Sequence, residues 1–174
     1  MTELAAVPVP AEVVAALDGT PTVGELDQAF LFLTADPTGL VDVCLLSRTE
    51  IEPGHDHVRL VVASTRARRN LQASHRATLV AVCGDAAHYL GLEVRRTVEG
   101  DEVGEVAVGA GAGAVGVGAG AVGVELTVVR SLRDDVGVEL RPLQFRAGEQ
   151  LRVTEHWDRT ATLLARLGGR EPVP

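Results

Sequence analysis

Hydroxyl and arginine side chains gather at one predicted strand-to-helix turn of the sequence. Ser64 and Thr65 end an apolar run, and Arg66, Arg68 and Arg69 open the short polar segment that follows. Hydroxyls, free backbone amides and guanidinium groups at a helix N-terminus are the donors that a phosphate group requires. Because arginines are unfavourable near the positive end of a helix dipole, three of them favour an anionic partner. The alternative is a solvated arginine face beside an ordinary helix cap.

The remaining reactive side chains form weaker patterns. His55 and His57 flank Asp56 in a predicted turn, and their spacing puts both imidazoles on one side, as a metal site needs. The sequence offers no third ligand, so we expect a solvated loop and no metal. Cys44 and Cys83 lie in apolar runs, which is typical of buried, reduced thiols. No nucleophile arrangement can be read from spacing alone, so catalytic residues stay unassigned.

Composition narrows the possible functions. The 174 residues include 24 acidic and 16 basic groups, all the latter arginine, for a net charge of −8. This balance argues against sequence-independent binding of nucleic acid. The absence of lysine excludes a Schiff-base lysine and a Walker-type phosphate loop. The length suits a single domain over 1–174, and the N-terminus lacks the basic segment of a signal peptide, so we expect a cytoplasmic protein.

A low-complexity segment interrupts the second half of the sequence. Val106–Val124 contains only glycine, alanine and valine, and the heptad GAGAVGV occurs twice in tandem, over 111–117 and 118–124. The run is nearly long enough to span a membrane, but its seven glycines disfavour a helix, so we do not expect a membrane protein. We interpret 104–124 as a glycine-rich insertion between two strands.

The apolar periodicity predicts a mainly β protein. We expect helices over 11–17, 65–74 and 155–167, and strands over 29–36, 40–47, 58–64, 77–84, 88–100, 124–135 and 136–146. The first two strands are joined by a short turn and predict a hairpin. Six or seven strands with few helices between them predict an antiparallel β-barrel with flanking helices, the last of them C-terminal.

This order of elements resembles the split barrel of the pyridoxamine 5′-phosphate oxidase-like flavoproteins. The resemblance rests on FLFLTADPTGLVDVCLLS for the opening hairpin, RLVVASTRARRNLQASHRATLVAV for the phosphate-binding turn and its flanking strands, and AHYLGLEVRRTVEGD for the strand beside the flavin ring. It covers roughly residues 25–102. It implies a homodimer with an FMN in each of two clefts between the subunits, and an oxidoreductase activity on a small-molecule substrate that the sequence does not identify.

The resemblance also implies which residues contact the cofactor. Ser64, Thr65 and Arg66 match the phosphate ligands, and Arg69 and Asn70 lie close enough along the predicted helix to assist them. The segment Cys44, Leu45, Leu46 and Ser47 would pass beside the ring, and His88 and Tyr89 would reach the ring edge.

The sequence departs from the family pattern at two cofactor positions. Asp42 and Ser47 stand where the family's oxidases carry an arginine and a lysine. An acidic residue there would repel a phosphate. The pattern therefore leaves three alternatives open: an FMN-dependent oxidoreductase, a protein that uses a deazaflavin, and a split-barrel dimer without flavin that acts as a non-enzymatic binding or regulatory module.

Overall fold

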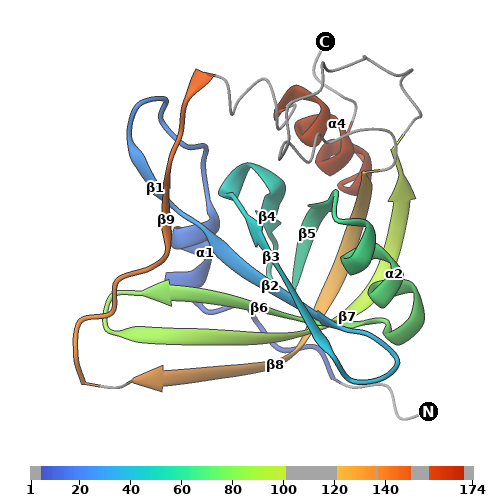
Figure 1. Ribbon diagram of the computed structural model, residues 1–174, viewed down its shortest axis with the longest axis horizontal. Coiled ribbons are helices and arrows are strands. Elements are labelled where there is room, and N and C mark those ends of the chain that lie inside the picture. The colour runs from blue at the N-terminus through green and yellow to red at the C-terminus, as the bar shows by residue number, and fades with distance from the viewer. Residues whose placement is uncertain (1–4, 101–120, 136, 150–156, 171–174) are drawn as a thin grey trace.

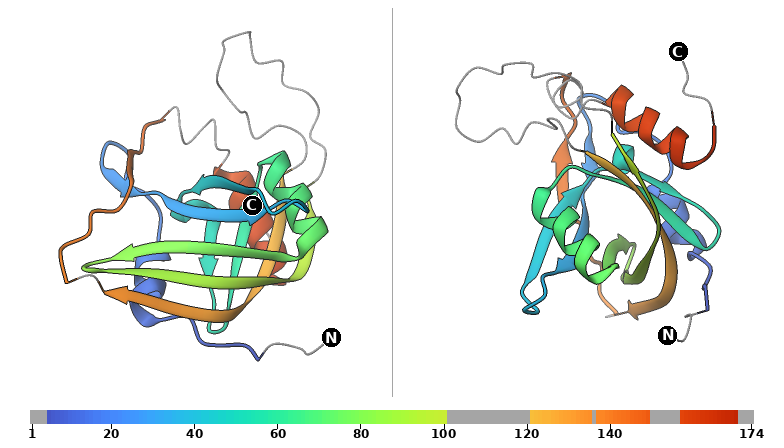
Figure 2. Two further views of the ribbon diagram at one scale, coloured as in Figure 1. Left: turned by 60° about the horizontal axis from the view of Figure 1, so that its bottom comes forward. Right: turned by 90° about the vertical axis from the view of Figure 1, so that its right-hand side faces the viewer.

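The computed structural model describes residues 5–100, 121–135, 137–149 and 157–170. Its centre is a seven-stranded antiparallel sheet with the strand order β3-β2-β6-β7-β8-β5-β4. The sheet curls into a half-barrel with helices packed against it (Figures 1 and 2). The strands are β2 (Phe30–Ala35), β3 (Val41–Leu46), β4 (Ile51–Pro53), β5 (His57–Val62), β6 (Arg76–Cys83), β7 (Ala86–Glu99) and β8 (Val122–Asp135). The expectation of a mainly β, antiparallel barrel-type fold is confirmed.

The helices occur where the periodicity predicts them. In the part of the chain that the structure describes, they are α1 (Ala11–Leu17), α2 (Thr65–Ser74) and α4 (Trp157–Leu167), with a short 3-10 helix η1 (Arg48–Glu50) between β3 and β4. Within the described residues, no helix is both long enough and apolar enough to cross a membrane. Ser64 caps α2, because its Oγ accepts a hydrogen bond from the backbone N–H of Ala67 at 3.3 Å. The helix ends at His75, which adopts the left-handed conformation with φ 56°.

One predicted strand is largely absent. We expected a strand over 136–146, but residues 137–143 are irregular, and only β9 (Gln144–Arg146) is extended. Gly137 has a φ of +68°, and Pro142 has no N–H to donate, so this stretch is poorly suited to a sheet. β9 instead pairs with β1 (Leu26–Gln28) in a separate two-stranded sheet.

The main core fills the concave side of the sheet. Alternation along the strands points Phe30, Phe32, Leu79 and Leu90 inward, where each is fully buried. α1 and α2 close this core. A second, smaller cluster lies on the other side of the sheet, where Leu163, Leu164 and Leu167 of α4 pack on Val61 and Ala121.

The glycine-rich insertion leaves the sheet at a closed hairpin. β7 and β8 pair antiparallel from Ala86–Asp135 to Glu99–Val122, and the backbone N–H of Gly100 donates to the carbonyl of Ala121 at 3.0 Å. The second heptad ends inside β8, since Val122 and Val124 are buried in the main core. The remainder of the predicted insertion, over 104–120, lies outside the described residues.

Candidate functional site

The predicted phosphate-binding turn lies against the edge strand β3. Arg66 Nη1 lies 3.4 Å from Asp42 Oδ1. One turn further along α2, Asn70 Nδ2 donates to Asp42 Oδ2 at 3.0 Å and to Thr34 Oγ1 at 3.1 Å. We call Thr34, Asp42, Arg66 and Asn70 the elbow cluster. The residue that departs most clearly from the family pattern, Asp42, is therefore in direct contact with two of the predicted cofactor residues.

The polar side chains at this turn differ in their exposure and in the hydrogen bonds that they already make. The Ser64 hydroxyl accepts a hydrogen bond from the backbone N–H of Ala67 and so caps the helix. Asn70 is buried, with 3% of its surface exposed. Thr65, Arg66 and Arg69 are exposed, and the side chain of Arg66 is 78% exposed. Arg66 and Arg69 can therefore reach an anion in solvent, whereas Asn70 is fixed in its contacts with the β2–β3 hairpin.

The four predicted residues Cys44, Leu45, Leu46 and Ser47 lie in β3 or directly after it. Their side chains point in different directions. Leu45 faces outward and is 54% exposed, whereas Leu46 is buried in the core and Cys44 packs against it. Ser47 is also buried and is the N-cap of η1: its backbone N–H donates to Glu50 Oε2 at 2.8 Å, and its hydroxyl lies 2.5 Å from that of Thr49.

The Cys44 thiol is held in its protonated form. Burial raises its pKa to about 11, and the negative charges of Glu50 and Asp42 add to that effect. Its Sγ lies 3.6 Å from the carbonyl of Phe32. A thiol with this pKa is a poor nucleophile at neutral pH, so Cys44 has the properties of a core residue.

The two predicted residues of β7 lie on opposite faces of the sheet. His88 points inward and is 1% exposed, with its Nε2 3.6 Å from Glu12 Oε1 of α1. Tyr89 points outward. His88 pairs with Ala81 and so lies near the β6–β7 turn, away from the end of β6 that follows α2. The eleven predicted cofactor residues therefore do not converge on one point.

Leu45 and Tyr89 belong to a continuous apolar surface. The registers align five outward-facing residues in one row across β3, β2, β6, β7 and β8: Leu45, Leu31, Val80, Tyr89 and Leu132. Val41 and Val43 extend this surface along β3 and are more than half exposed. We call it the outward face. Exposed apolar area that is contiguous over several strands is typical of a surface that binds another molecule.

A hollow of about 670 Å³ opens on the outward face beside the elbow cluster. Its lining includes Leu33, Val41, Thr78 and Gly91, and Arg76 and Arg130 add positive charge. A Cβ at Gly91 would lie 3.1 Å from that of Arg130, a tight contact, so a larger residue here would narrow the hollow. Thr34, which accepts the Asn70 hydrogen bond, is itself part of the lining. Because the Thr34 side chain points to the concave side, the hollow and the elbow cluster adjoin at this residue from opposite faces of the sheet.

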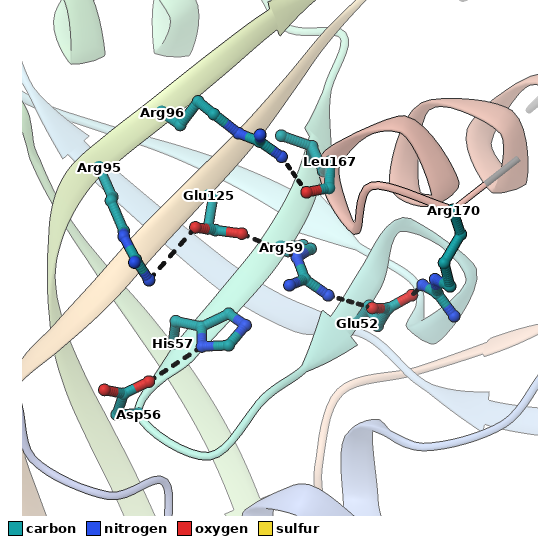
Figure 3. A network of polar contacts seen from close by, with 9 residues as sticks. All are labelled: Glu52, Asp56, His57, Arg59, Arg95, Arg96, Glu125, Leu167 and Arg170. Carbon is teal, nitrogen blue, oxygen red and sulfur yellow. Dashed lines mark hydrogen bonds and ion pairs between the residues drawn. The ribbon is translucent and has the colours of Figure 1, made fainter.

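A network of charges that the sequence analysis did not anticipate lies on the other half of the sheet (Figure 3). The registers place Arg96, Glu125, Arg59 and Glu52 in one row across β7, β8, β5 and β4. Arg59 donates to Glu125 Oε2 at 2.9 Å and to Glu52 Oε1 at 2.6 Å. The available signal was the presence of single charged residues, Arg59 and Glu125, inside apolar runs, since such residues are rarely buried unless paired.

The predicted His–Asp–His cluster contributes to the edge of this network. His57 Nδ1 lies 3.0 Å from Asp56 Oδ1, and this hydrogen bond lowers the pKa of Asp56. Among the residues that the structure describes, no three histidine, cysteine, aspartate or glutamate side chains are grouped so that they could hold a metal ion.

Comparisons with known proteins return structural similarity alone. No family model matches the sequence, and no curated protein matches it. A crystal structure of an FMN-binding protein from Syntrophomonas wolfei subsp. wolfei aligns with 64% of this chain and 78% of its own, at 13% identity and a TM-score of 0.44. An F420 reductase aligns with 66% of this chain and 97% of its own, at 12% identity and a TM-score of 0.45.

Proposed function

We propose that this chain binds FMN or a deazaflavin and acts as a flavin-dependent oxidoreductase. The observation that carries the proposal is the junction of the elbow cluster with the hollow on the outward face, which share Thr34. A phosphate needs exposed positive charge, and a flavin ring needs a flat apolar surface with room above it. These two requirements are met side by side. The cofactor class is taken from the sequence resemblance.

The donor set fits this assignment in part. Arg66 and Arg69 would hold the phosphate, and the outward side chains around Gly91 would support the ring. Asp42 opposes the phosphate, because its carboxylate competes for the Arg66 guanidinium at 3.4 Å. When bound, a flavin supplies hydride or electron transfer. The residues of the chain would bind and orient it and exclude water from one side of the ring.

The proposed site includes a second copy of the chain. The outward face leaves Val41, Val43 and Leu45 exposed on an edge strand, and an uncovered apolar face of this kind favours association. In a homodimer assembled through this face, the hollow would become a cleft between subunits, with the ring enclosed and a small-molecule substrate entering from solvent. We further propose a cytoplasmic location, as expected from the reduced cysteines.

Titration of FMN, followed by the quenching of flavin fluorescence, tests the assignment. Arg66→Ala should weaken binding by about tenfold, the effect of losing a charge-assisted hydrogen bond. Asp42→Asn should strengthen binding, since it removes the competing carboxylate. Arg133→Ala is the matched control, because Arg133 pairs with Asp85 and Asp135 far along β8. Equal affinities for the wild type, Arg66→Ala and Arg133→Ala would remove the elbow cluster from the site.

The second candidate function is a split-barrel dimer without flavin that serves as a binding or regulatory module. The contact between Arg66 and Asp42 favours it, because it partly neutralises the predicted phosphate site from within the chain. The absorption spectrum of the purified protein separates the two candidates. Flavin bands, or their appearance on adding FMN or a deazaflavin, support the oxidoreductase; a colourless protein that binds neither cofactor supports the module.

A further inference from the structure

A separate cavity lies on the opposite flank of α2 from the elbow cluster. It has a volume of about 370 Å³, is partly open to solvent, and is bounded by α2 and by the paired ends of β7 and β8. Leu71, Val94, Val122 and Val124 provide an apolar floor. We call it the helix-flank cavity. An apolar floor with a few polar groups at its rim is the usual form of a site for a small molecule.

Three arginines and a histidine line this cavity. Arg68 and His75 come from α2, and Arg95 and Arg96 come from β7. Because α2 has 3.6 residues per turn, Arg68 and His75 share a flank that is different from the flank carrying Arg66 and Asn70. Any anion held by Arg68 therefore lies apart from the proposed flavin phosphate.

A β-bulge brings the two β7 arginines to the same place. The register passes from Val94↔Leu126 to Arg96↔Glu125, so Arg95 is an extra residue in β7. In a regular strand, consecutive side chains point to opposite faces; a bulge breaks this alternation and redirects a side chain. Arg95 and Arg96 consequently line both the helix-flank cavity and an adjoining cavity of about 350 Å³ beside the C-terminus of α4.

The charges around these arginines do not balance. The Glu125 carboxylate is shared between two arginines: Arg59 contacts Oε2, and Arg95 Nη1 lies 3.4 Å from Oε1. Arg96 donates to the carbonyl of Leu167, a contact that leaves its positive charge in place (Figure 3). Glu99 is the acidic residue of the cavity lining. Among the described residues that line the cavity, three arginines are accompanied by one glutamate.

We propose that the helix-flank cavity binds a small organic anion, in which a carboxylate or a phosphate ester is joined to an apolar body. The anionic group would lie among Arg68, Arg95 and Arg96, where guanidinium forks suit both of these groups. The apolar body would lie on the valine and leucine floor. Glu99 sets a limit on affinity, because its carboxylate repels the anion. This site does not depend on flavin binding.

Phenyl phosphate and benzoate are suitable probes, and inorganic phosphate and benzyl alcohol supply the charge and the ring separately. Each is titrated into the isotopically labelled full-length protein, and binding is followed by NMR chemical shifts. We expect phenyl phosphate or benzoate to bind about tenfold more tightly than either separate part, with shifts centred on Leu71, His75 and Val94. The tighter of the two probes identifies the anionic group.

Three variants connect the binding to the proposed residues. Arg68→Met keeps the apolar stem and should weaken the better probe by about tenfold, whereas Glu99→Gln should strengthen it severalfold. Arg133→Met is the matched surface control and should bind as the wild type does. The proposal is overturned if the shifts centre elsewhere, if inorganic phosphate binds as tightly as the probe, or if Glu99→Gln leaves the affinity unchanged. The last comparison holds even if Arg68→Met does not fold.

Discussion

The amide of Asn70 joins α2 to the β2–β3 hairpin. Its two hydrogen bonds satisfy Thr34 and Asp42, which would otherwise lack this donor. We expect Asn70→Ala to lower the free energy of unfolding by about 1–3 kcal/mol, because the change leaves a buried hydroxyl and a carboxylate less well satisfied. Urea denaturation measures this. Gln72→Ala, at an exposed position of the same helix, is the control and should change stability by less than about 0.5 kcal/mol.

The Cys44 thiol gives a pH-dependent prediction. Since its pKa is raised from 9.0 to about 11, alkylation by iodoacetamide should keep accelerating above pH 9, where an ordinary thiol levels off. The folded protein also retains this proton when the unfolded chain has lost it, so stability should fall as the pH rises from 9 towards 11.

The measurement uses a Cys83→Ser background, so that only one thiol reacts. Adding Asp42→Asn should shift the alkylation midpoint to lower pH, because Asp42 is one of the charges that raise the Cys44 pKa. A midpoint near 9 in the folded protein would contradict the burial of this thiol.

At the scale of elements, Glu125 ties β8 to β5 and β7. Its side chain is 9% exposed. Burial would raise its pKa, but the hydrogen bond from Arg59 and the charges of Arg59, His57 and Arg95 outweigh burial and lower it. A lowered carboxyl pKa stabilises the fold above the unfolded-state pKa of 4.5, and this stabilisation is lost as the pH falls through the lower, folded-state pKa.

Glu125→Gln should therefore lower the free energy of unfolding mainly near neutral pH. We expect the difference in unfolding free energy between wild type and variant to be largest above about pH 6 and to shrink as the wild-type carboxylate is protonated. Urea denaturation at a series of pH values measures it, with the exposed Glu99→Gln as control. A difference that does not change with pH would indicate that lost packing, and not lost charge, explains the effect.

Local patterns were sufficient to predict most elements. The alternation in Phe30–Ala35 is a signal contained in a few neighbouring residues, and it was interpreted correctly. The short strands β1 and β4 were missed because three residues carry no measurable period, and β9 is the extended part of the strand expected over 136–146. The stretch before β9 was misread because its apolar residues outweighed Pro142 in the pattern.

The site was less accessible to prediction from the sequence. The turn before α2 was recognised from its own residues, but its contact with Asp42 joins positions 24 and 28 residues apart. The contact of the buried His88 with Glu12 of α1 joins positions 76 residues apart. The charge row from Arg96 to Glu52 depends on three strand pairings, and the register of Arg96 depends on a bulge that no local pattern marks.

At the scale of the whole molecule, the outward face predicts the oligomeric state. Leu45→Glu places a charge in the middle of β3, where the side chain is exposed in the single chain. The substitution should therefore leave the fold intact but convert the proposed dimer to a monomer, because burying an unpaired carboxylate in an interface is costly. Light scattering after size-exclusion chromatography measures the mass.

Val138→Glu is the control for that experiment, since Val138 is equally exposed but lies outside the outward face. It should leave the mass unchanged. A wild-type protein that is monomeric at all concentrations would remove the second copy from the proposed site.

The hydrogen bond between Gly100 and Ala121 has a consequence for evolution and engineering. It fixes the two ends of the intervening chain beside each other, at a separation that does not depend on how many residues lie between them. Lengthening a connection whose ends are already fixed costs little, because closure entropy grows only with the logarithm of length. Copies of the heptad could be gained or lost here by replication slippage without altering the sheet. The same position is suited to hosting a foreign domain, whose two termini the barrel would hold together.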